Sequence, residues 1–198
     1  MPFWSENFSI QGGAALNDPK RKFRFTVSMG GIDATPGGAL MWYAKSASKP
    51  SFTIERGEHK YLNHTFYYPG SVSWSEVEVT LVDPRDPDMT ATIADIINLS
   101  GYTPPSNPNS LGSMSKGRAA GAVGQVQIAQ LDADGNEIER WTLWNAFIMD
   151  VNFGDLAYGD DDLVEITLKL SYDWARVQTI GQPSQATNGS GEVSFFQS

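Results

Sequence analysis

The chain has 198 residues, a length typical of one domain, and 40% of them are hydrophobic, which is enough to build a substantial core. Asp and Glu number 23 against 14 Lys and Arg, so the formal charge of −9 argues against a surface that wraps DNA. The lack of cysteine excludes disulfides and thiolate chemistry. No stretch approaches the roughly 20 apolar residues of a membrane helix, and residues 1–13 do not resemble a signal peptide, so we expect a soluble protein made in the cytoplasm.

Alternating apolar and polar residues predict several strands in the first half of the chain. Residues 22–29 read KFRFTVSM, in which every second side chain from Phe23 onward is apolar, the period of a half-buried strand. Two shorter strands are expected at 41–45 and 51–55, separated by a turn or bulge. Residues 59–68 are rich in aromatic and strand-favouring residues, so they are expected to continue this β-structure.

Residues 72–82 predict a strand with one buried and one exposed face. Its apolar face carries Val77, Val79 and Leu81, and its polar face carries Glu76, Glu78 and Thr80. This separation predicts that one face packs on a core while the other meets water.

One helix is predicted after this strand. Between Met89 and Ile97 the apolar residues recur at helical spacing, with Asp86 or Asp88 as the N-cap and Gly101 beyond the end. The next residues, 103–124, read TPPSNPNSLGSMSKGRAAGAVG and are too poor in apolar side chains to order themselves. A long flexible loop is therefore expected there.

A β-hairpin is predicted further along the chain. Residues 125–131 and 138–144 have strand patterns and flank the sequence DADGNE. Within it, Asp134 and Gly135 favour a type I′ turn, in which the central residues need positive φ. The two flanking strands are expected to pair with each other.

Two further strands complete the predicted fold. Residues 145–153 place a set of apolar side chains on one face, namely Phe147, Met149, Val151 and Phe153. Residues 163–174 show the most regular alternation in the chain, from Val164 to Tyr172. Seven or eight strands with one helix indicate a mainly β fold: two packed antiparallel sheets, as a β-sandwich or partly closed barrel, with one flanking α-helix.

The chain is expected to divide into an N-terminal arm (1–21), a β-sandwich domain (22–177) that carries the flexible loop, and a C-terminal tail (178–198). The tail is rich in Gly, Ser and Gln, apart from a short apolar set near its end, Val193, Phe195 and Phe196. These apolar side chains suit the tail for docking on another surface.

Two acidic segments are candidates for metal or catalytic sites, and neither has the spacing that such a site needs. DADGNEIE resembles a calcium loop, but counted from Asp132 its Gly135 is fourth rather than sixth, and Leu143 occupies the twelfth position. A hairpin turn is favoured there. The three aspartates at 160–162 are consecutive and point in different directions, which favours a solvated turn over a metal site or a glycosidase pair.

The remaining motifs also favour a structural role. His59 and His64, the only histidines, are expected on opposite faces of one strand, where they cannot share a metal ion. The glycines of 117–124 lack the Lys-Ser or Lys-Thr pair of a phosphate-binding loop, and the tryptophans are expected to fill the core. Because no nucleophile and base can be paired, no enzyme activity, cofactor or metal is predicted.

Two stretches together resemble the tail tube proteins of contractile-tailed bacteriophages. They are residues 67–84, YYPGSVSWSEVEVTLVDP, and residues 141–175, WTLWNAFIMDVNFGDLAYGDDDLVEITLKLSYDWA. In that family a strand like KFRFTVS is followed by a long excursion, a strand like W-x-x-V-x-V-T and a helix. The order of these motifs, over about 23–174, carries the resemblance. The loop at 103–124 and the tail are longer than the family pattern needs.

The resemblance implies a structural subunit that assembles six to a ring, with rings stacked into a tube whose acidic lumen passes DNA during ejection. The implied partners are further copies of the chain, the tail sheath, the baseplate and terminator proteins, and genomic DNA that passes without specific binding. The implied location is the tail tube of the virion, after assembly in the host cytoplasm.

The resemblance also implies roles for six charged residues. The candidates for facing the lumen are Glu76 and Glu78. The excursion at 41–68 matches the segment that reaches the adjacent ring, so the candidates for contacts between rings are Lys45, Lys49, Arg56 and Lys60.

Two alternatives remain open at the level of sequence. A secretion-system tube protein related to haemolysin-coregulated proteins, or a pyocin-type tube subunit, would share the fold and the rings but pass other cargo. A carbohydrate-binding β-sandwich is the alternative from another class, because aromatic residues that can stack on sugars cluster at Phe66, Tyr67, Tyr68, Trp74, Trp141, Trp144 and Trp174.

Overall fold

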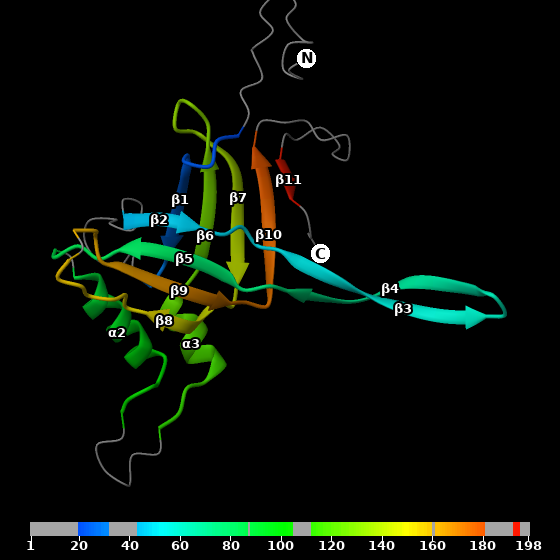
Figure 1. Cartoon of the computed structure of the whole chain (residues 1–198), viewed down its shortest axis with the longest axis horizontal. Coiled ribbons are helices and arrows are strands. Elements are labelled where there is room, and N and C mark those ends of the chain that lie inside the picture. The colour runs from blue at the N-terminus through cyan, green and yellow to red at the C-terminus, as the bar shows by residue number, and fades with distance from the viewer. Residues whose placement is uncertain are drawn as a thin grey trace, which may run out of the picture.

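The computed structural model describes residues 20–31, 43–86, 88–104, 112–159, 161–180 and 192–194. Within these residues two antiparallel sheets pack face to face, with their strands crossing at a steep angle (Figure 1). Two helices lie at one end of the sandwich, and a two-stranded arm projects from its side. The predicted mainly β fold of two packed antiparallel sheets is confirmed.

The first sheet has five strands, all paired antiparallel. Their order is β1 (Phe25–Met29), β6 (Val126–Leu131), β7 (Glu137–Trp144), β10 (Trp174–Ile180) and β11 (Glu192–Ser194). The strand predicted at 22–29 is present as β1, and the hairpin predicted around DADGNE is present as β6 and β7.

The turn of that hairpin differs from the predicted type I′ geometry. Gly135 has a φ of 84°, but Asp134 does not have a positive φ, and the pairing register shifts between Gln130 and Leu131. The Asp132 carboxylate accepts hydrogen bonds from the backbone N–H groups of Asp134 and Asn136, both at 2.8 Å. The side chain of Asp132 therefore fixes a longer hairpin turn with a bulge.

The second sheet has four strands and supplies much of the core. Their order is β2 (Ala44–Ala47), β5 (Val77–Val82), β9 (Glu165–Ser171) and β8 (Phe147–Asn152). The two central strands bury every second side chain completely, as their alternation predicted: Val77, Val79, Leu81, Ile166, Leu168 and Leu170 are all 0% exposed. These residues join Val27, Met29, Val126 and Leu143 of the first sheet in one core cluster.

Strand β8 corrects the prediction that one face would carry four apolar side chains. The pairing of β8 with β9 shifts register between Ile148 and Asp150, so Met149 lies in a bulge and is 51% exposed. Beyond the strand, Phe153 is also exposed, whereas Ile148 and Val151 pack against the core. The bulge moves the apolar pattern to the other face, which regular alternation cannot predict.

The predicted helix is present as α2 (Met89–Leu99). The side chain of Asp88 caps it by accepting a hydrogen bond from the N–H of Ala91, at 3.0 Å, and Gly101 follows its end with a φ of 100°. Its apolar face, including Met89 and Ile93, is buried in the core.

A second helix, α3 (Lys116–Val123), lies in the segment expected to be a loop, and that expectation was wrong for its C-terminal part. Ser115 caps the helix by accepting from the N–H of Arg118. Ala119 and Val123 are buried, and α3 packs against α2 and β8. The low apolar content misled the prediction because a helix this short needs only two small core side chains when its neighbours supply the rest.

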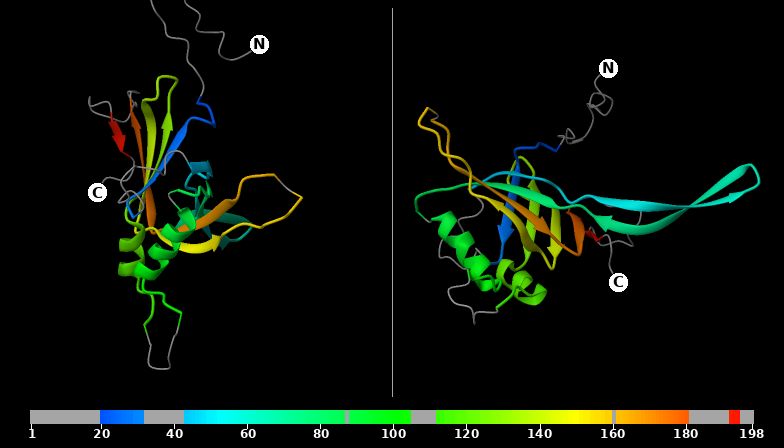
Figure 2. Two further views of the ribbon diagram at one scale, coloured as in Figure 1. Left: turned by 90° about the vertical axis from the view of Figure 1, so that its left-hand side faces the viewer. Right: turned by 60° about the horizontal axis from the view of Figure 1, so that its bottom comes forward.

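Figure 2 shows the arrangement from two further sides. The helices pack beneath the four-stranded sheet, and the loop between β8 and β9 projects from the opposite end of the sandwich to the arm. No helix of the described residues is long and apolar enough to span a membrane.

Candidate assembly surfaces

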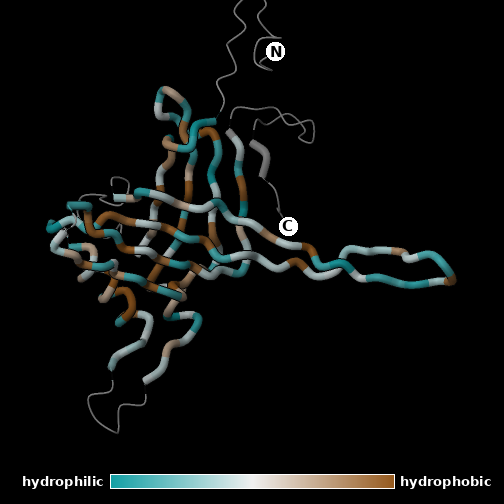
Figure 3. The backbone as a smooth tube through the Cα atoms, viewed as in Figure 1, coloured by the Kyte–Doolittle hydropathy of each residue, from teal (hydrophilic) through white to brown (hydrophobic). Residues whose placement is uncertain are grey.

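The arm consists of β3 (Phe52–Tyr61) and β4 (His64–Trp74), which pair only with each other in the described part of the chain. The strand predicted at 72–82 is therefore divided: its first residues belong to the arm, and β5 begins after a link at Ser75 and Glu76. The exposed large apolar side chains of the arm are Phe52, Ile54, Tyr61, Leu62, Phe66, Tyr67, Tyr68 and Val72. Figure 3 shows hydrophobic residues at both the root and the tip of the arm. Because a lone hairpin is marginally stable in water, this surface is suited to contact another molecule.

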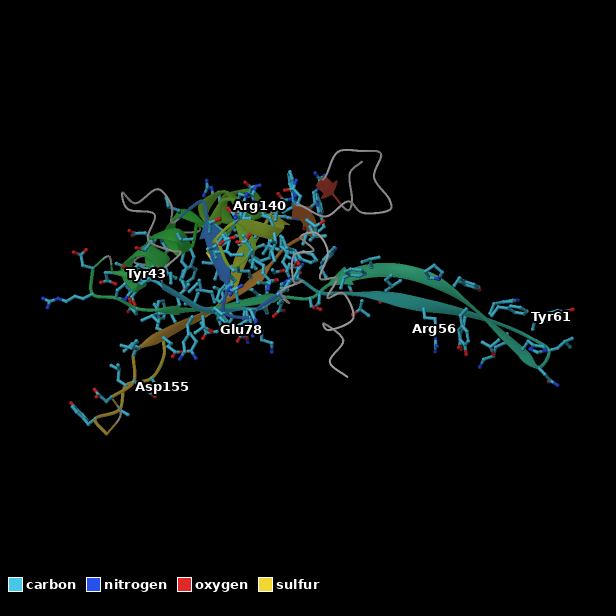
Figure 4. The ribbon with its side chains drawn as sticks, turned by 90° about the horizontal axis from the view of Figure 1, so that it is seen from above. Tyr43, Arg56, Tyr61, Glu78, Arg140 and Asp155 are labelled. Atoms are coloured by element: carbon cyan, nitrogen blue, oxygen red, sulfur yellow. The ribbon has the colours of Figure 1, made fainter. Side chains whose placement is uncertain are left out.

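One face of the arm is charged and aromatic. The Arg56 guanidinium lies 4.2 Å from the centre of the Tyr67 ring, and Lys60 lies 3.7 Å from Glu58. Figure 4 shows Arg56 along the arm and Tyr61 near its tip, far from the sandwich. The predicted contact residues Arg56 and Lys60 thus lie together on this arm.

The opposite face of the arm is mainly aromatic and carries both histidines. In the register of the hairpin, His59 pairs with Phe66 and Tyr61 pairs with His64, so His59 and His64 lie on the same face of adjacent strands. The expectation that the histidines fall on opposite faces of one strand was wrong, because the chain turns between them. Among the described residues, no group of three or more His, Asp or Glu side chains could hold a metal ion.

The tip of the arm exposes an apolar residue in an unusual conformation. Leu62 is 87% exposed and has a φ of 52°, a region that glycine or asparagine enters at lower cost than leucine. The backbone of this turn would favour glycine at that position. The leucine is therefore better explained by what its side chain contacts than by the turn itself.

The two predicted lumen residues lie close together but not on one strand. Glu78 points from the exposed face of β5, whereas Glu76 lies in the link between β4 and β5 (Figure 4). Two other acids of the four-stranded sheet are paired with lysines, Glu165 with Lys45 and Asp150 with Lys169. Glu78 is exposed on that face and makes no ion pair within the described residues.

The other two predicted contact lysines lie on the sandwich rather than on the arm, and both have partners within the chain. Lys45, on β2, pairs with Glu165. Lys49, in the link between β2 and β3, donates hydrogen bonds of 2.6 Å to both Glu139 and Gln130. Lys45 and Lys49 are thus separated from Arg56 and Lys60, and the structure does not bring the four together.

A buried carboxylate on the five-stranded sheet was not predicted. Glu139, on β7, is 7% exposed and accepts hydrogen bonds from Lys20, from Lys49 and from the indole N–H of Trp141 at 2.6 Å. Burial alone would raise the pKa of Glu139, but these hydrogen bonds together outweigh it and lower that pKa to about 2. Glu139 lies two residues before Trp141 and four before Leu143, and both of these side chains face inward. In a strand this spacing places all three on one face, so the sequence could have revealed that Glu139 is buried.

This cluster predicts a defined dependence of stability on pH. Because the pKa of Glu139 is lower in the folded protein than the ordinary glutamate value of 4.5, its stabilisation is present above that value and is lost as the pH falls toward about 2. Glu139→Gln is expected to lower the free energy of unfolding at neutral pH by about 2 kcal/mol. The variant should also lose less stability than the parent between about pH 5 and pH 2, as measured by urea unfolding.

The matched control for this substitution is Glu58→Gln, because Glu58 forms an ion pair with a lysine on the exposed arm. The control is expected to change the free energy of unfolding by less than about 0.5 kcal/mol. Equal effects of the two substitutions would show that Glu139 does not hold the segments of Lys20 and Lys49 on the sheet.

The acidic turn between β8 and β9 is solvated, as expected. Asp155, Asp161 and Asp162 are all exposed, and the loop also presents Leu156 and Tyr158 to solvent. The loop borders a shallow pocket of about 590 Å³. None of these carboxylates is paired with a base or nucleophile in a catalytic arrangement.

The aromatic residues are divided between core and surface, which corrects the expectation that the tryptophans fill the core. Trp74 and Trp141 pack against the core cluster. Trp144 and Trp174 instead stack on the outer face of the five-stranded sheet, 6.1 Å apart, with Arg176 over the Trp144 ring. Phe66, Tyr67 and Tyr68 all lie on the arm, so these aromatic residues do not form one sugar-binding surface.

No protein-family model matches the sequence, and no curated protein matches it either. Solved structures do match. A chain of the PVC sheath–tube complex of an extracellular contractile injection system, in the extended state, has a TM-score of 0.61 at 16% identity, covering 83% of this chain and 95% of that one.

Two related assemblies contain similar chains. One is the PVC sheath/tube terminator in the extended state, with a TM-score of 0.61 at 17% identity over 83% of this chain and 100% of that one. The other is the baseplate of the anti-feeding prophage, with a TM-score of 0.56 at 17% identity over 81% and 95%. These likenesses establish a shared fold, so the resemblance to contractile-tail proteins inferred from the sequence is confirmed at the level of fold.

Proposed function

We propose that the chain is the tube-forming subunit of a contractile phage tail, with six copies in each ring and rings stacked into a tube. The observation that carries the proposal is the arm, which exposes aromatic side chains on both faces and has no partner sheet in the described residues. The fold supports it, since similar chains occur in a sheath–tube complex and a tube terminator.

The sheet edges support ring closure by identical copies. Among the described strands, β2 and β8 are the edges of the four-stranded sheet. Unpaired strand edges attract another strand, and a heterologous contact between the two different edges of neighbouring copies closes into a ring when the rotation fits. Six copies agree with the sixfold symmetry described for the anti-feeding prophage baseplate.

The arm supports stacking of one ring on the next. It extends well beyond the sandwich (Figure 4), and the register of the hairpin places Arg56 and Lys60 on one face. The loop between β8 and β9, at the other end of the molecule, carries the exposed aspartates Asp155, Asp161 and Asp162. Opposite charges on distant parts of one chain suit a contact between copies, with the arm of one copy reaching the acidic surface of another. Lys45 and Lys49, which pair with Glu165 and Glu139 on the sandwich, are not part of the contact proposed here.

Electron microscopy of the purified protein tests the proposal. Stacked rings or tubes with sixfold symmetry are expected, whereas a monomer retained on a glycan column would favour the carbohydrate-binding alternative. Copurification of the tubes with a sheath and with nuclease-protected DNA would favour a phage tail over a secretion-system tube. The proposed partners are the sheath, baseplate and terminator proteins of the same tail.

The lumen assignment gives a prediction about cargo. If Glu76 and Glu78 face the channel, Glu76→Lys/Glu78→Lys places positive charge where DNA passes, and DNA release from assembled particles should fall about tenfold or more because each lysine attracts phosphate. Tube formation should be unchanged. The control, Asp95→Lys/Asp134→Lys, makes the same change of charge at exposed positions of α2 and the β6–β7 turn. Normal release from particles that carry the lysines at 76 and 78 would refute the assignment.

A further inference from the structure

An apolar groove lies between the root of the arm and β10. It has a volume of about 530 Å³ and is lined by Phe52, Ile54, Val72, Trp74, Trp174, Ala175 and Arg176. Phe52, Ile54 and Val72 are each about half exposed, at 45%, 50% and 53%. Apolar surface of this kind is stabilised when another apolar side chain covers it.

The edge of β10 beside this groove is open. Over its length from Trp174 to Thr179, β10 pairs on one side with β7. On its other side it pairs with β11 only at Gln178, Thr179 and Ile180. In the described residues, the backbone of 174–177 therefore has no strand on its outer side, and it is this part of β10 that lines the groove.

The pairing of β11 points into this gap. Ser194 lies opposite Gln178, and the strands are antiparallel, so the chain leaves β11 in the direction of the groove. Continuing the register by one residue at a time places Phe195 opposite Val177, Phe196 opposite Arg176 and residue 197 opposite Ala175. Three residues are enough to reach the groove.

The same register decides which side chain faces inward. Ala175 is fully buried, and Val177, two residues along the strand, points to the same side. A residue opposite Val177 points to that side as well, toward the layer that contains the arm root. Phe195 would thus lie on the inner side of the sheet with Ala175, which lines the groove, and Phe196 would lie on the outer side beside Arg176, which lines the groove from that side.

We propose that residues 195–197, which lie outside the described residues, extend β11 along the open edge of β10 and place the Phe195 ring in this groove. Ser194 fixes the start of the segment beside its site, so its effective concentration there is far higher than that of a segment from a second copy. With the groove filled in this way, residues 195–197 would connect the five-stranded sheet to the root of the arm, and they would pair with the open edge of β10. Ring formation would have to use the four-stranded sheet instead.

Substitution of the phenylalanine tests this arrangement in the full chain. Phe195→Ser is expected to lower Tm by about 5 °C and to speed hydrogen exchange of the backbone N–H groups of residues 174–177 at least tenfold. The control is Phe66→Ser, at an exposed position on the arm, which should change neither. Equal, small effects of the two substitutions would overturn the proposal.

A crosslink identifies which copy supplies the occupant. Because the chain has no cysteine, Ile54→Cys/Phe195→Cys carries only the two introduced thiols. Oxidation of a mixture of isotopically labelled and unlabelled protein should give a link within one chain, detected by mass spectrometry. A link between labelled and unlabelled chains would show that a second copy fills the groove, and the absence of any link would show that the segment does not reach it. Either result refutes the proposal without bearing on whether the protein forms rings.

Discussion

Removal of the arm is expected to abolish stacking of rings while leaving the sandwich folded. Replacing residues 55–71 with Asn-Gly keeps the Ile54–Val72 pair and closes it with a two-residue turn. The buried core contains no residue of the replaced segment, so the free energy of unfolding should change little. The variant loses most of the exposed aromatic surface and both basic side chains of the arm, so rings should remain single.

Electron microscopy and sedimentation velocity measure this result, and thermal unfolding checks that the sandwich is intact. Tubes of normal length from the shortened protein would show that stacking relies on other surfaces. A point substitution separates the role of the tip from that of the whole arm. Leu62→Asp should shorten the tubes, whereas Leu99→Asp, at a leucine that is 69% exposed at the end of α2, should not.

The alternation of apolar and polar residues predicted burial correctly in strands that have no bulge. In β9 the alternation of apolar and polar residues matches the burial of Ile166, Leu168 and Leu170 completely, because a central strand has partners on both sides and a core on one face. In β8 the same reasoning failed, because the bulge at Met149 inserts a residue that alternation cannot represent. An edge strand tolerates such an insertion more readily than a central one.

The arm shows another limit of local patterns. The residues of β3 and β4 have high strand propensity, which the sequence indicates, but propensity does not say whether a strand joins a sheet or leaves it. Only the resemblance to tube proteins implied an excursion. The alternation of residues 72–82 even continued across the boundary, so the link at Glu76 between the arm and β5 was not predicted.

The positions of the six charged candidate residues were predicted in part, because local patterns give the face of a strand but not its distant partners. Glu78 was placed correctly on the exposed face of a strand, and Arg56 and Lys60 on the excursion. The sequence could not reveal that Lys49 binds Glu139, because the two are 90 residues apart and meet only when the sheets pack. Pairs at such separation depend on the tertiary fold, and no spacing rule identifies them.

A glycine at the end of β1 is expected to be required for folding. Gly31 donates a hydrogen bond to the carbonyl oxygen of Val123 at 2.9 Å, which brings the chain against the C-terminal end of α3. A Cβ atom at Gly31 would lie 2.0 Å from the carbonyl oxygen of Ala122, a distance that no real contact allows. Because both groups are backbone, neither can move without separating β1 from α3.

Gly31→Ala is therefore expected to lower the free energy of unfolding by about 3 kcal/mol or more, measured by urea denaturation. Gly121→Ala is the matched control, since Gly121 lies within α3 and an added Cβ meets no atom within 4 Å. That substitution should raise the free energy of unfolding by about 0.5–1 kcal/mol, because alanine favours a helix more than glycine does. If both alanines stabilised the protein, the close packing of β1 on α3 would be wrong, and so would the conclusion that α3 belongs to the folded sandwich rather than to a loop.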